Sequence, residues 1–329
     1  MKYPDLLECR VAIVTTKYFY TVIVTSVLTV LLSLFAIFGN LLIIIAIARN
    51  KRIQSQSNVL LGSLCLSDLL IGIMVQPIYV ARGILEVLGK TNGPYCTLQK
   101  VHIFFAYFGV GASITTMAIV SVDRWFAICR PFLYREFQSK GKCLTVIAID
   151  WSILLILMLT PYLGLRSVAI YIGAALVMVI SITTIIACYI SIYFVIIRHK
   201  RRISEQTVSQ VEASDERSQR PEERRKTNTV AILIAVLFVC YVPHVACISY
   251  KSFSGQKIII ISKVVETIIL MNSSINPAIY CLRMSEIRSA VKNLLRKIFF
   301  KSEDNVLSLD ARKHQMAGRE ISSKLSRGQ

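Results

Sequence analysis

The sequence has 329 residues, of which 54% are hydrophobic and only 17% are charged. Soluble domains carry about 25% charged residues, so much of this surface must face something other than water. The formal charge of +19 invites a nucleic-acid-binding interpretation. The basic residues, however, occur in short patches between long apolar runs. This pattern argues against nucleic acid as a partner and favours an anionic membrane surface.

Seven apolar runs are each long enough to cross a hydrocarbon core of about 30 Å, which takes roughly 20 helical residues. The first run is too long for a signal-peptide core and lacks a small-residue cleavage site, so we expect it to be retained. The sequence predicts an all-α integral membrane protein with a short N-terminus (1–17) and a seven-transmembrane helix bundle (18–283). The runs are 18–48, 57–81, 101–127, 143–163, 168–197, 227–249 and 258–282.

The segment after the last run has a different pattern. Over 284–300, apolar residues such as Ile287 and Val291 recur at helical spacing among basic residues. This spacing predicts an amphipathic helix that lies on the cytoplasmic membrane surface. Mixed charge predicts a linker at 199–226, and the polar composition of 301–329 predicts a disordered cytoplasmic tail.

Basic residues follow the odd-numbered runs. Arg49, Lys51 and Arg52 follow the first run, and other Lys and Arg residues follow the third and fifth runs and fill the tail. Because cytoplasmic loops are rich in Lys and Arg, we expect an extracellular N-terminus and a cytoplasmic C-terminus. The protein is therefore predicted to be a multi-pass protein of the plasma membrane.

Polar residues in the middle of these runs are functional candidates, because an Asp there costs about 2.5–3.5 kcal/mol on insertion scales. Two longer motifs accompany them, Ser121-Val122-Asp123-Arg124-Trp125-Phe126-Ala127-Ile128 and Asn276-Pro277-Ala278-Ile279-Tyr280. The fourth run carries Trp151 and the sixth Cys240-Tyr241-Val242-Pro243. Together, these fragments resemble the class A (rhodopsin-like) G protein-coupled receptors from about residue 18 to residue 300. The polar set comprises Asn40, Asp68, Ser113, Asn272, Ser273 and Asn276.

The resemblance implies an activation switch at the inner end of the bundle. In this family the arginine that corresponds to Arg124 pairs with acids, here Asp123 and Glu223, and its release allows a G protein to bind. Alternatively, Arg124 and Glu223 are solvated charges at the membrane interface. The complete set of predicted coupling residues is Asp123, Arg124, Tyr189, Glu223, Asn276, Pro277 and Tyr280.

The resemblance also implies a sodium pocket in the middle of the membrane. A buried carboxylate either takes up a proton or holds a cation, and oxygen ligands suit a hard ion. Sodium is therefore expected as an allosteric modulator, and no other cofactor is expected. The alternative is a water-filled polar cluster that braces the helices. The expected ligands are Asp68, Ser113, Asn272, Ser273 and Asn276.

Some positions depart from the family pattern. Tyr241 stands where the family usually has tryptophan, and the second outer loop, before Val168, is very short and lacks a cysteine. The usual disulfide from the third span to that loop therefore cannot form. The short loop is similar to that of the melanocortin, cannabinoid, lysophospholipid and adenosine receptor group. Cys9, Cys96 and Cys247 are the cysteines placed near the outer face, and no pairing is assigned to them.

The outer halves of the third, sixth and seventh runs are expected to form the ligand site. Amine receptors have an aspartate at the position of Ala106, and opsins have a lysine at the position of Leu270, so both classes are disfavoured. Glu266 is expected either to pair with a cationic ligand or with His244, or to pair elsewhere within the protein. The candidate residues are Gln76, His102, Ala106, Tyr107, Tyr241, His244 and Glu266.

These patterns predict a receptor that converts binding of an extracellular small-molecule, lipid or peptide ligand into activation of a heterotrimeric G protein. The alternative is a transporter or channel, although no repeated halves are visible. No HExxH pair or nucleophile elbow is found, so an enzyme is not expected. Arrestin and receptor kinases are candidate partners of the tail, which carries Ser302, Ser308, Ser322, Ser323 and Ser326.

Overall fold

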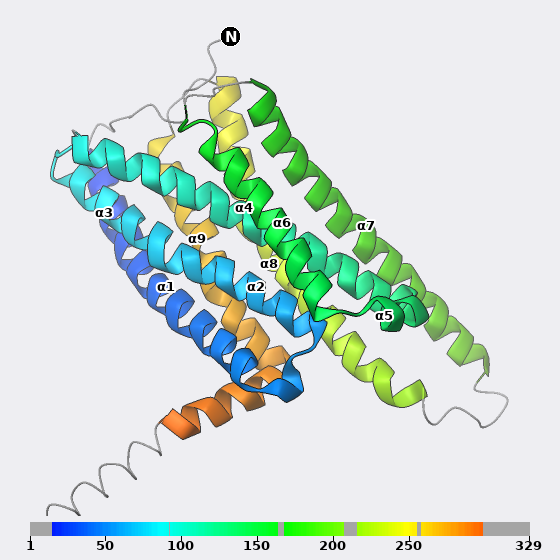
Figure 1. The fold of residues 1–329 in the computed structure, drawn as a ribbon. Coiled ribbons are helices and arrows are strands. Elements are labelled where there is room, and N and C mark those ends of the chain that lie inside the picture. Colours follow the sequence, from blue (N-terminus) through cyan, green and yellow to red (C-terminus); the bar gives the residue numbers. More distant parts are fainter. Residues whose placement is uncertain (1–14, 92, 164–167, 207–215, 255–257, 299–329) are drawn as a thin grey trace, which may run out of the picture.

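The computed structural model describes residues 15–298 except 92, 164–167, 207–215 and 255–257. The described part of the chain contains helices and no strand, in a single bundle (Figure 1). The elements are α1 (Thr16–Arg49), η1 (Lys51–Ile53), α2 (Gln56–Leu70), η2 (Ile71–Val75), α3 (Gln76–Val87), α4 (Gly93–Cys129), α5 (Pro131–Phe137), α6 (Lys140–Leu159), α7 (Val168–Gln206), α8 (Glu216–Ser254) and α9 (Ile259–Arg283).

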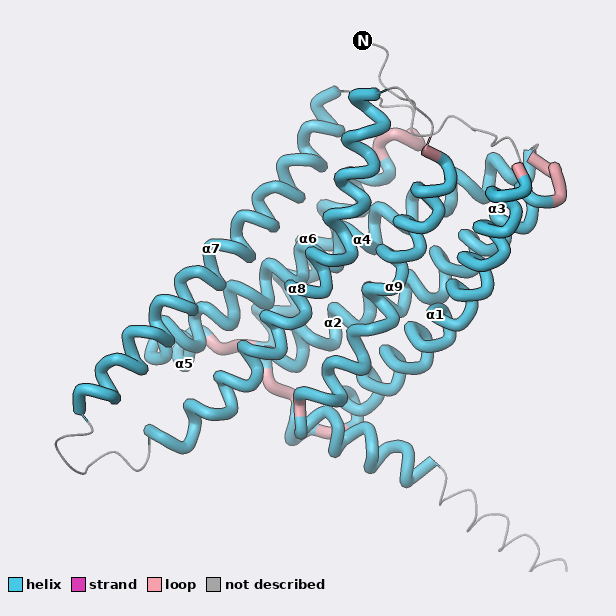
Figure 2. The backbone as a smooth tube through the Cα atoms, turned by 180° about the vertical axis from the view of Figure 1, so that it is seen from behind, coloured by secondary structure: helices cyan, strands magenta, loops and turns pink. Residues whose placement is uncertain are grey.

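Seven helical stretches in this bundle are long and apolar enough to cross a membrane, which confirms the predicted seven-helix architecture. Because α2, η2 and α3 are continuous, they form one span, Gln56–Val87. We name the two ends of the bundle by elements that lie there: the α3 end and, opposite it, the α5 end (Figures 1 and 2).

Several predicted boundaries were wrong. The second span continues past residue 81 to Val87, because the charged residues there pair inside the bundle. The fourth ends at Leu159 rather than residue 163, since Pro161 has no N–H to continue the helix. The predicted linker at 199–226 is partly helical: α7 continues to Gln206 and α8 begins at Glu216.

A helix at residues 285–298 follows α9 and leaves the bundle at the α5 end (Figure 2). We call it the surface helix. Ile287 and Leu294 are buried against the main apolar core, whereas Arg288 and Lys292 are exposed. This confirms the amphipathic pattern predicted for 284–300, of which 299 and 300 lie outside the described residues. The N-terminal residues 1–14 and the tail at 301–329 also lie outside them, so the disorder predicted for the tail is untested.

Helices α1 and α9 approach each other closely in the half of the bundle nearer the α5 end. A Cβ atom on Gly39 would lie 2.7 Å from Cβ of Pro277, so only glycine fits there without a shift of the proline ring. Pro277 has no N–H, which leaves the carbonyl of Ser273, four residues earlier, without its helical donor. Asn40 Nδ2 donates to this carbonyl oxygen at 3.1 Å. The polar residue of α1 thus compensates for the proline of α9.

Candidate functional site

Asp123 and Arg124 lie on α4 at the α5 end, and both side chains are buried. Arg124 Nε donates to Asp123 Oδ2 at 3.1 Å. The same carboxylate accepts from Gln56 Nε2 at 2.9 Å and from Ser57 Oγ at 3.1 Å, both at the start of α2. Arg124 also donates to Ser57 and to the Tyr134 hydroxyl of α5. A charge pair at the bundle end is therefore held by hydrogen bonds from two neighbouring elements.

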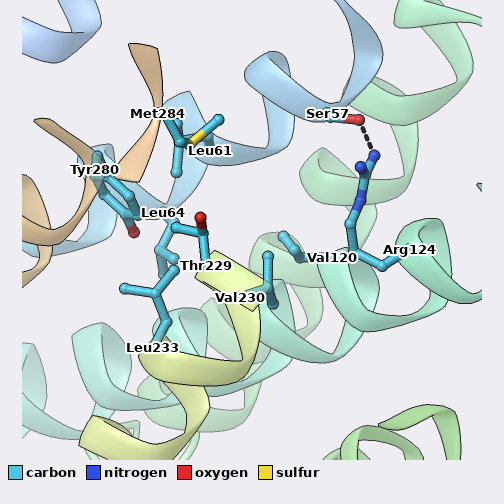
Figure 3. Close-up of a pocket in the computed structure, with 10 residues that line it drawn as sticks. All are labelled: Ser57, Leu61, Leu64, Val120, Arg124, Thr229, Val230, Leu233, Tyr280 and Met284. Carbon is cyan, nitrogen blue, oxygen red and sulfur yellow. Dashed lines mark hydrogen bonds between the residues drawn. The ribbon is translucent and has the colours of Figure 1, made fainter. Parts of the chain in front are cut away.

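Beside Arg124 lies a cavity of about 30 Å³, which α2, α4, α8 and α9 line. In Figure 3, Arg124 points towards Ser57, and Tyr280 lies on the other side of the cavity. The Tyr280 hydroxyl is buried and has no hydrogen-bond partner within the described part of the chain. A volume of this size holds only one or two water molecules. This cavity is therefore too small to admit a segment of another protein.

The other predicted coupling residues fall at the same end or just above it. Tyr189 of α7 packs against the main apolar core and lies close enough to Arg124 to interact with it electrostatically. Asn276 and Pro277 are buried in α9. Glu223 lies in the first part of α8, but its side chain is outside the described residues, so its pairing with Arg124 stays a prediction.

The predicted sodium-pocket residues are all buried in the middle of the bundle. Asn276 Nδ2 donates to Asp68 Oδ2 at 2.7 Å, which links α9 to α2, and Ser273 lies beside the same carboxylate. Asp68 Oδ1, the Ser113 hydroxyl, Asn272 Oδ1 and Asn276 Oδ1 have no hydrogen-bond partner among the described residues.

Buried polar atoms without partners require an explanation. Every unpartnered atom in this set is an oxygen, and the set includes one carboxylate, which is the donor chemistry that a hard cation prefers. These residues therefore fit a sodium ion. The described residues hold no group of three or more His, Cys, Asp and Glu side chains that could bind a metal ion, so a site of transition-metal type has no support there.

A second polar cluster, which we call the ionic cluster, lies at the α3 end. Lys263 Nζ lies 2.9 Å from Glu86 Oε2. The same carboxylate accepts from the hydroxyls of Tyr18 at 2.6 Å and Tyr95 at 2.7 Å. Glu86 and Lys263 are only 3% and 6% exposed. Four helices, α1, α3, α4 and α9, thus meet on one buried ion pair.

Arg82 and Glu266 complete this cluster, with His102 between them. Arg82 donates to His102 Nδ1 at 2.9 Å, and because arginine can only donate, the imidazole proton lies on Nε2. This nitrogen is 3.5 Å from Glu266 Oε1, and Arg82 is 3.8 Å from the same oxygen. The cluster thus holds two acidic residues, Glu86 and Glu266, and two basic residues, Arg82 and Lys263. Their charges cancel.

The structure brings together some of the predicted ligand residues. His102 and Glu266 are in contact, and His244 lies close enough to Glu266 to interact electrostatically. Gln76 is buried deeper, and its Nε2 donates to the Leu270 carbonyl at 2.9 Å. Ala106 packs against the small apolar core that contains Leu270. Tyr107 is exposed, and Tyr241 lies towards the middle of the bundle, near Asp68.

Sequence reasoning missed four charged residues in the spans. Arg82 and Glu86 lie beyond the predicted end of the second span, so they were assigned no role. Lys263 lies in the first turns of α9, and Asp150 lies in the middle of α6, where its carboxylate accepts from the Thr115 hydroxyl at 2.7 Å. For Lys263 and Asp150 the signal was available, because both lie within predicted runs and any ionisable residue within a membrane span is a functional candidate.

The cysteines at the α3 end are now partly assigned. Cys96 is disulfide-bonded. Cys247 is free, and its sulfur lies 3.6 Å from the Ser262 hydroxyl. Cys9 lies outside the described residues.

Comparison with known proteins shows a specific similarity. The profile of the 7 transmembrane receptor (rhodopsin family) matches residues 39–171 and 165–280. The chain is 24% identical over 301 residues to cannabinoid receptor 1 of Xenopus laevis, an alignment that covers 82% of this chain and 62% of that receptor. It is 26% identical over 297 residues to trace amine-associated receptor 1 of Mus musculus, with 82% and 88% covered.

A third relative matches over a shorter region. The chain is 30% identical over 140 residues to the D(1B) dopamine receptor of Homo sapiens, with 42% of this chain and 28% of that receptor covered. The chain thus spans less than two thirds of the length of some curated relatives that it matches. The similarity to a cannabinoid receptor agrees with the receptor group expected from the short outer loop.

Proposed function

Because the chain belongs to the rhodopsin family of seven-transmembrane receptors, we propose that it converts binding of an extracellular ligand into nucleotide exchange on a heterotrimeric G protein. Membership in this family disfavours the transporter or channel alternative, and no enzymatic activity is proposed. The positive charge that follows α1, α4 and α7 supports a plasma-membrane receptor with its α5 end in the cytoplasm and its N-terminus outside.

The observation that carries this proposal is the environment of Arg124. A buried arginine at the cytoplasmic end of a membrane bundle is costly unless it is paired. Here Asp123 and Ser57 hold it beside a closed cavity. An outward movement of α8, which lines that cavity, would open the site for a G protein element. Activation would then be a choice between two packed arrangements, in which the charge of Arg124 changes partners.

We further propose that a sodium ion stabilises the closed state. Asp68, Ser113, Asn272, Ser273 and Asn276 would hold it, and the ion would supply positive charge to a buried carboxylate. These residues lie on α2, α4 and α9, so their own role is to fix three helices in one packing. The alternative, a water-filled brace, predicts no difference between sodium and potassium.

The ligand is proposed to bind at the α3 end. Of the two acids in the ionic cluster, Glu266 is the accessible one, with a side chain 28% exposed against 3% for Glu86. It also accepts no hydrogen bond of ordinary length from Arg82 or His102. His244 and Tyr107, which both lie close enough to Glu266 to interact with it electrostatically, would line the same space, and Gln76 would lie deeper in the bundle. The tail is proposed as the docking site for receptor kinases and arrestin.

The test is an exchange assay with an Arg124→Ala receptor reconstituted with purified G protein. The variant should lose most of its basal nucleotide exchange, while its amount at the cell surface stays unchanged. The matched control is Arg135→Ala, which removes an exposed arginine at the same end of the bundle. Undiminished exchange in Arg124→Ala would contradict the proposal. Glu223→Ala should have the opposite effect and raise basal exchange, because only the closed state would lose a contact.

A further inference from the structure

A groove of about 600 Å³ runs between α1 and α9, outside the seven-helix core. Large apolar residues of α1 form one wall, and Phe35 and Phe38 are the most exposed of them, at 68% and 62%. Residues of α9 form the other wall, and Val291 of the surface helix contributes at one end. The groove is lined by Leu31, Leu34, Phe35, Phe38, Gly39, Leu42, Ile43, Ser274, Pro277, Ala278, Cys281 and Val291.

The floor of the groove is apolar and closed. Gly39 contacts the Pro277 ring, which brings the two helices together below the projecting phenylalanine side chains. Ser274 is the polar residue of the lining, and its hydroxyl already donates to the Leu32 carbonyl at 2.8 Å. Such a surface cannot hydrogen-bond water, so it takes an apolar occupant.

The length of the groove matches one leaflet of a membrane. Its α1 wall extends from Leu31, near the middle of the helix, to Ile43, a rise of about 18 Å at 1.5 Å per residue. Half of a hydrocarbon core of about 30 Å is about 15 Å. The groove therefore reaches from the middle of the bilayer to the α5 end and not to the α3 end.

Positive charge collects where the groove meets that surface. Both helices that form its walls end in arginine: Arg49 is the last residue of α1, and Arg283 is the last residue of α9. Arg288 is exposed on the surface helix, one turn before Val291. Juxtamembrane Lys and Arg residues attract anionic lipids, each by about fivefold near the surface.

We propose that this groove binds one anionic phospholipid, with an acyl chain between α1 and α9 and the headgroup beside Arg283 and Arg288. This goes beyond the proposed receptor function, because it assigns a ligand to a surface outside the signalling sites. The charge at the mouth selects a phospholipid over a sterol, whose hydroxyl gains little from a guanidinium. The bound chain would lie against Pro277, the proline within α9.

The test is native mass spectrometry of the purified full-length receptor, titrated with dioleoyl-phosphatidylserine, dioleoyl-phosphatidylcholine or cholesterol. Phosphatidylserine should be retained at least fivefold more than phosphatidylcholine. Ala278→Trp, which fills the groove, should reduce phosphatidylserine retention several-fold. Its matched control is Ala148→Trp, at an exposed alanine of α6 outside the groove. Leu31→Trp fills the opposite end of the groove and replaces Ala278→Trp if that variant does not fold.

The headgroup contact is tested separately. Arg283→Gln combined with Arg288→Gln should lower phosphatidylserine retention to the level of phosphatidylcholine, whereas Lys140→Gln, an exposed lysine at the start of α6, should not. Equal retention of the two phospholipids by the unmodified receptor would overturn the proposal. So would unchanged retention in the groove-filling variants, or binding of cholesterol alone. None of these readouts involves a G protein, so their failure would leave the proposed receptor function intact.

Discussion

The ionic cluster at the α3 end and the polar residues around Asp68 are both buried in the same bundle, but they are satisfied differently. Glu86 has a cation and two tyrosine hydroxyls around it, and Arg82 and Glu266 balance each other nearby. Around Asp68, one carboxylate oxygen and several other oxygens have no partner among the described residues. Both carboxylate oxygens of Glu86 accept a hydrogen bond within the described residues, whereas Asp68 Oδ1 accepts none.

This difference separates a structural role from a regulatory one. A buried carboxylate that is paired with a cation holds helices together, and removal of one member of the pair is strongly destabilising. A set of unpartnered oxygens destabilises the empty state and is stabilised by a cation or by water. Removal of a charge should therefore destabilise the receptor at the ionic cluster, whereas around Asp68 it should remove the response to a cation.

The largest effect is expected from Lys263→Met. It leaves the Glu86 carboxylate buried without its cation, which typically costs about 3–5 kcal/mol. The unfolding temperature of the purified receptor, measured in detergent by thiol-reactive dye or light scattering, should fall by many degrees. Glu86→Gln added to Lys263→Met should restore much of the loss, because no charge is then left unpaired. If Lys263→Met alone unfolds at the same temperature as the unmodified receptor, this ion pair does not hold the bundle together.

A smaller response, which depends on sodium, is expected at Asp68. Sodium, compared with potassium at equal ionic strength, should raise the unfolding temperature of the unmodified receptor, since an ion that binds only the folded state stabilises it by RT ln(1 + [ion]/Kd). That is about 1.4 kcal/mol at ten times the Kd. Asp68→Asn keeps the size of the side chain but removes its charge, so the sodium effect should disappear without loss of the fold.

The reciprocal effect is part of the same prediction. If sodium stabilises the closed state, it should also lower basal nucleotide exchange, and Asp68→Asn should make exchange insensitive to sodium. If sodium and potassium have equal effects, or if the sodium effect survives Asp68→Asn, the region is a water-filled polar cluster that only braces the helices. Potassium controls for general screening of charge.

The two regions also differ in how far the sequence could predict them. The residues around Asp68 were predicted because each is a polar group in the middle of an apolar run, where burial is costly. Within the ionic cluster, His102 and Glu266 were predicted as ligand-site residues, but Arg82 and Glu86 were missed because they follow the apolar part of the second span and resemble loop charges. Only the fold brings them to Lys263, since the pairing joins helices that are far apart along the chain. A single sequence carries no record of such long-range partners.

A similar limit applies to the helix ends. The mixed charge after the fifth span predicted a linker, but charged residues such as Glu and Arg are good helix formers, and α7 and α8 continue through much of it. Pro161, in contrast, marks the end of α6 by a local steric rule that the sequence does show. The prediction did not apply this rule and placed the end of the fourth span at residue 163.

The smallest effect is expected from Asn40→Ala, which tests whether a side chain in α1 compensates for the proline of α9. The variant removes the donor to the Ser273 carbonyl, which Pro277 leaves without a helical partner. Interhelical hydrogen bonds in membranes contribute about 0.6 kcal/mol on average and up to about 1.7 kcal/mol, because the unfolded state in the membrane also finds partners. The free energy of unfolding of the purified variant should therefore decrease by an amount within that range.

The decisive comparison is a double-mutant cycle with Pro277→Ala, read out by stability alone because Pro277 belongs to the proposed switch. Alanine at this position restores an N–H that can donate to the Ser273 carbonyl, so the side chain of Asn40 is no longer needed there. Asn40→Ala should then cost measurably less in the Pro277→Ala background than in the unmodified receptor. Equal costs in both backgrounds would mean that Asn40 stabilises the bundle through another contact, such as its hydrogen bond to the Ala36 carbonyl at 2.8 Å.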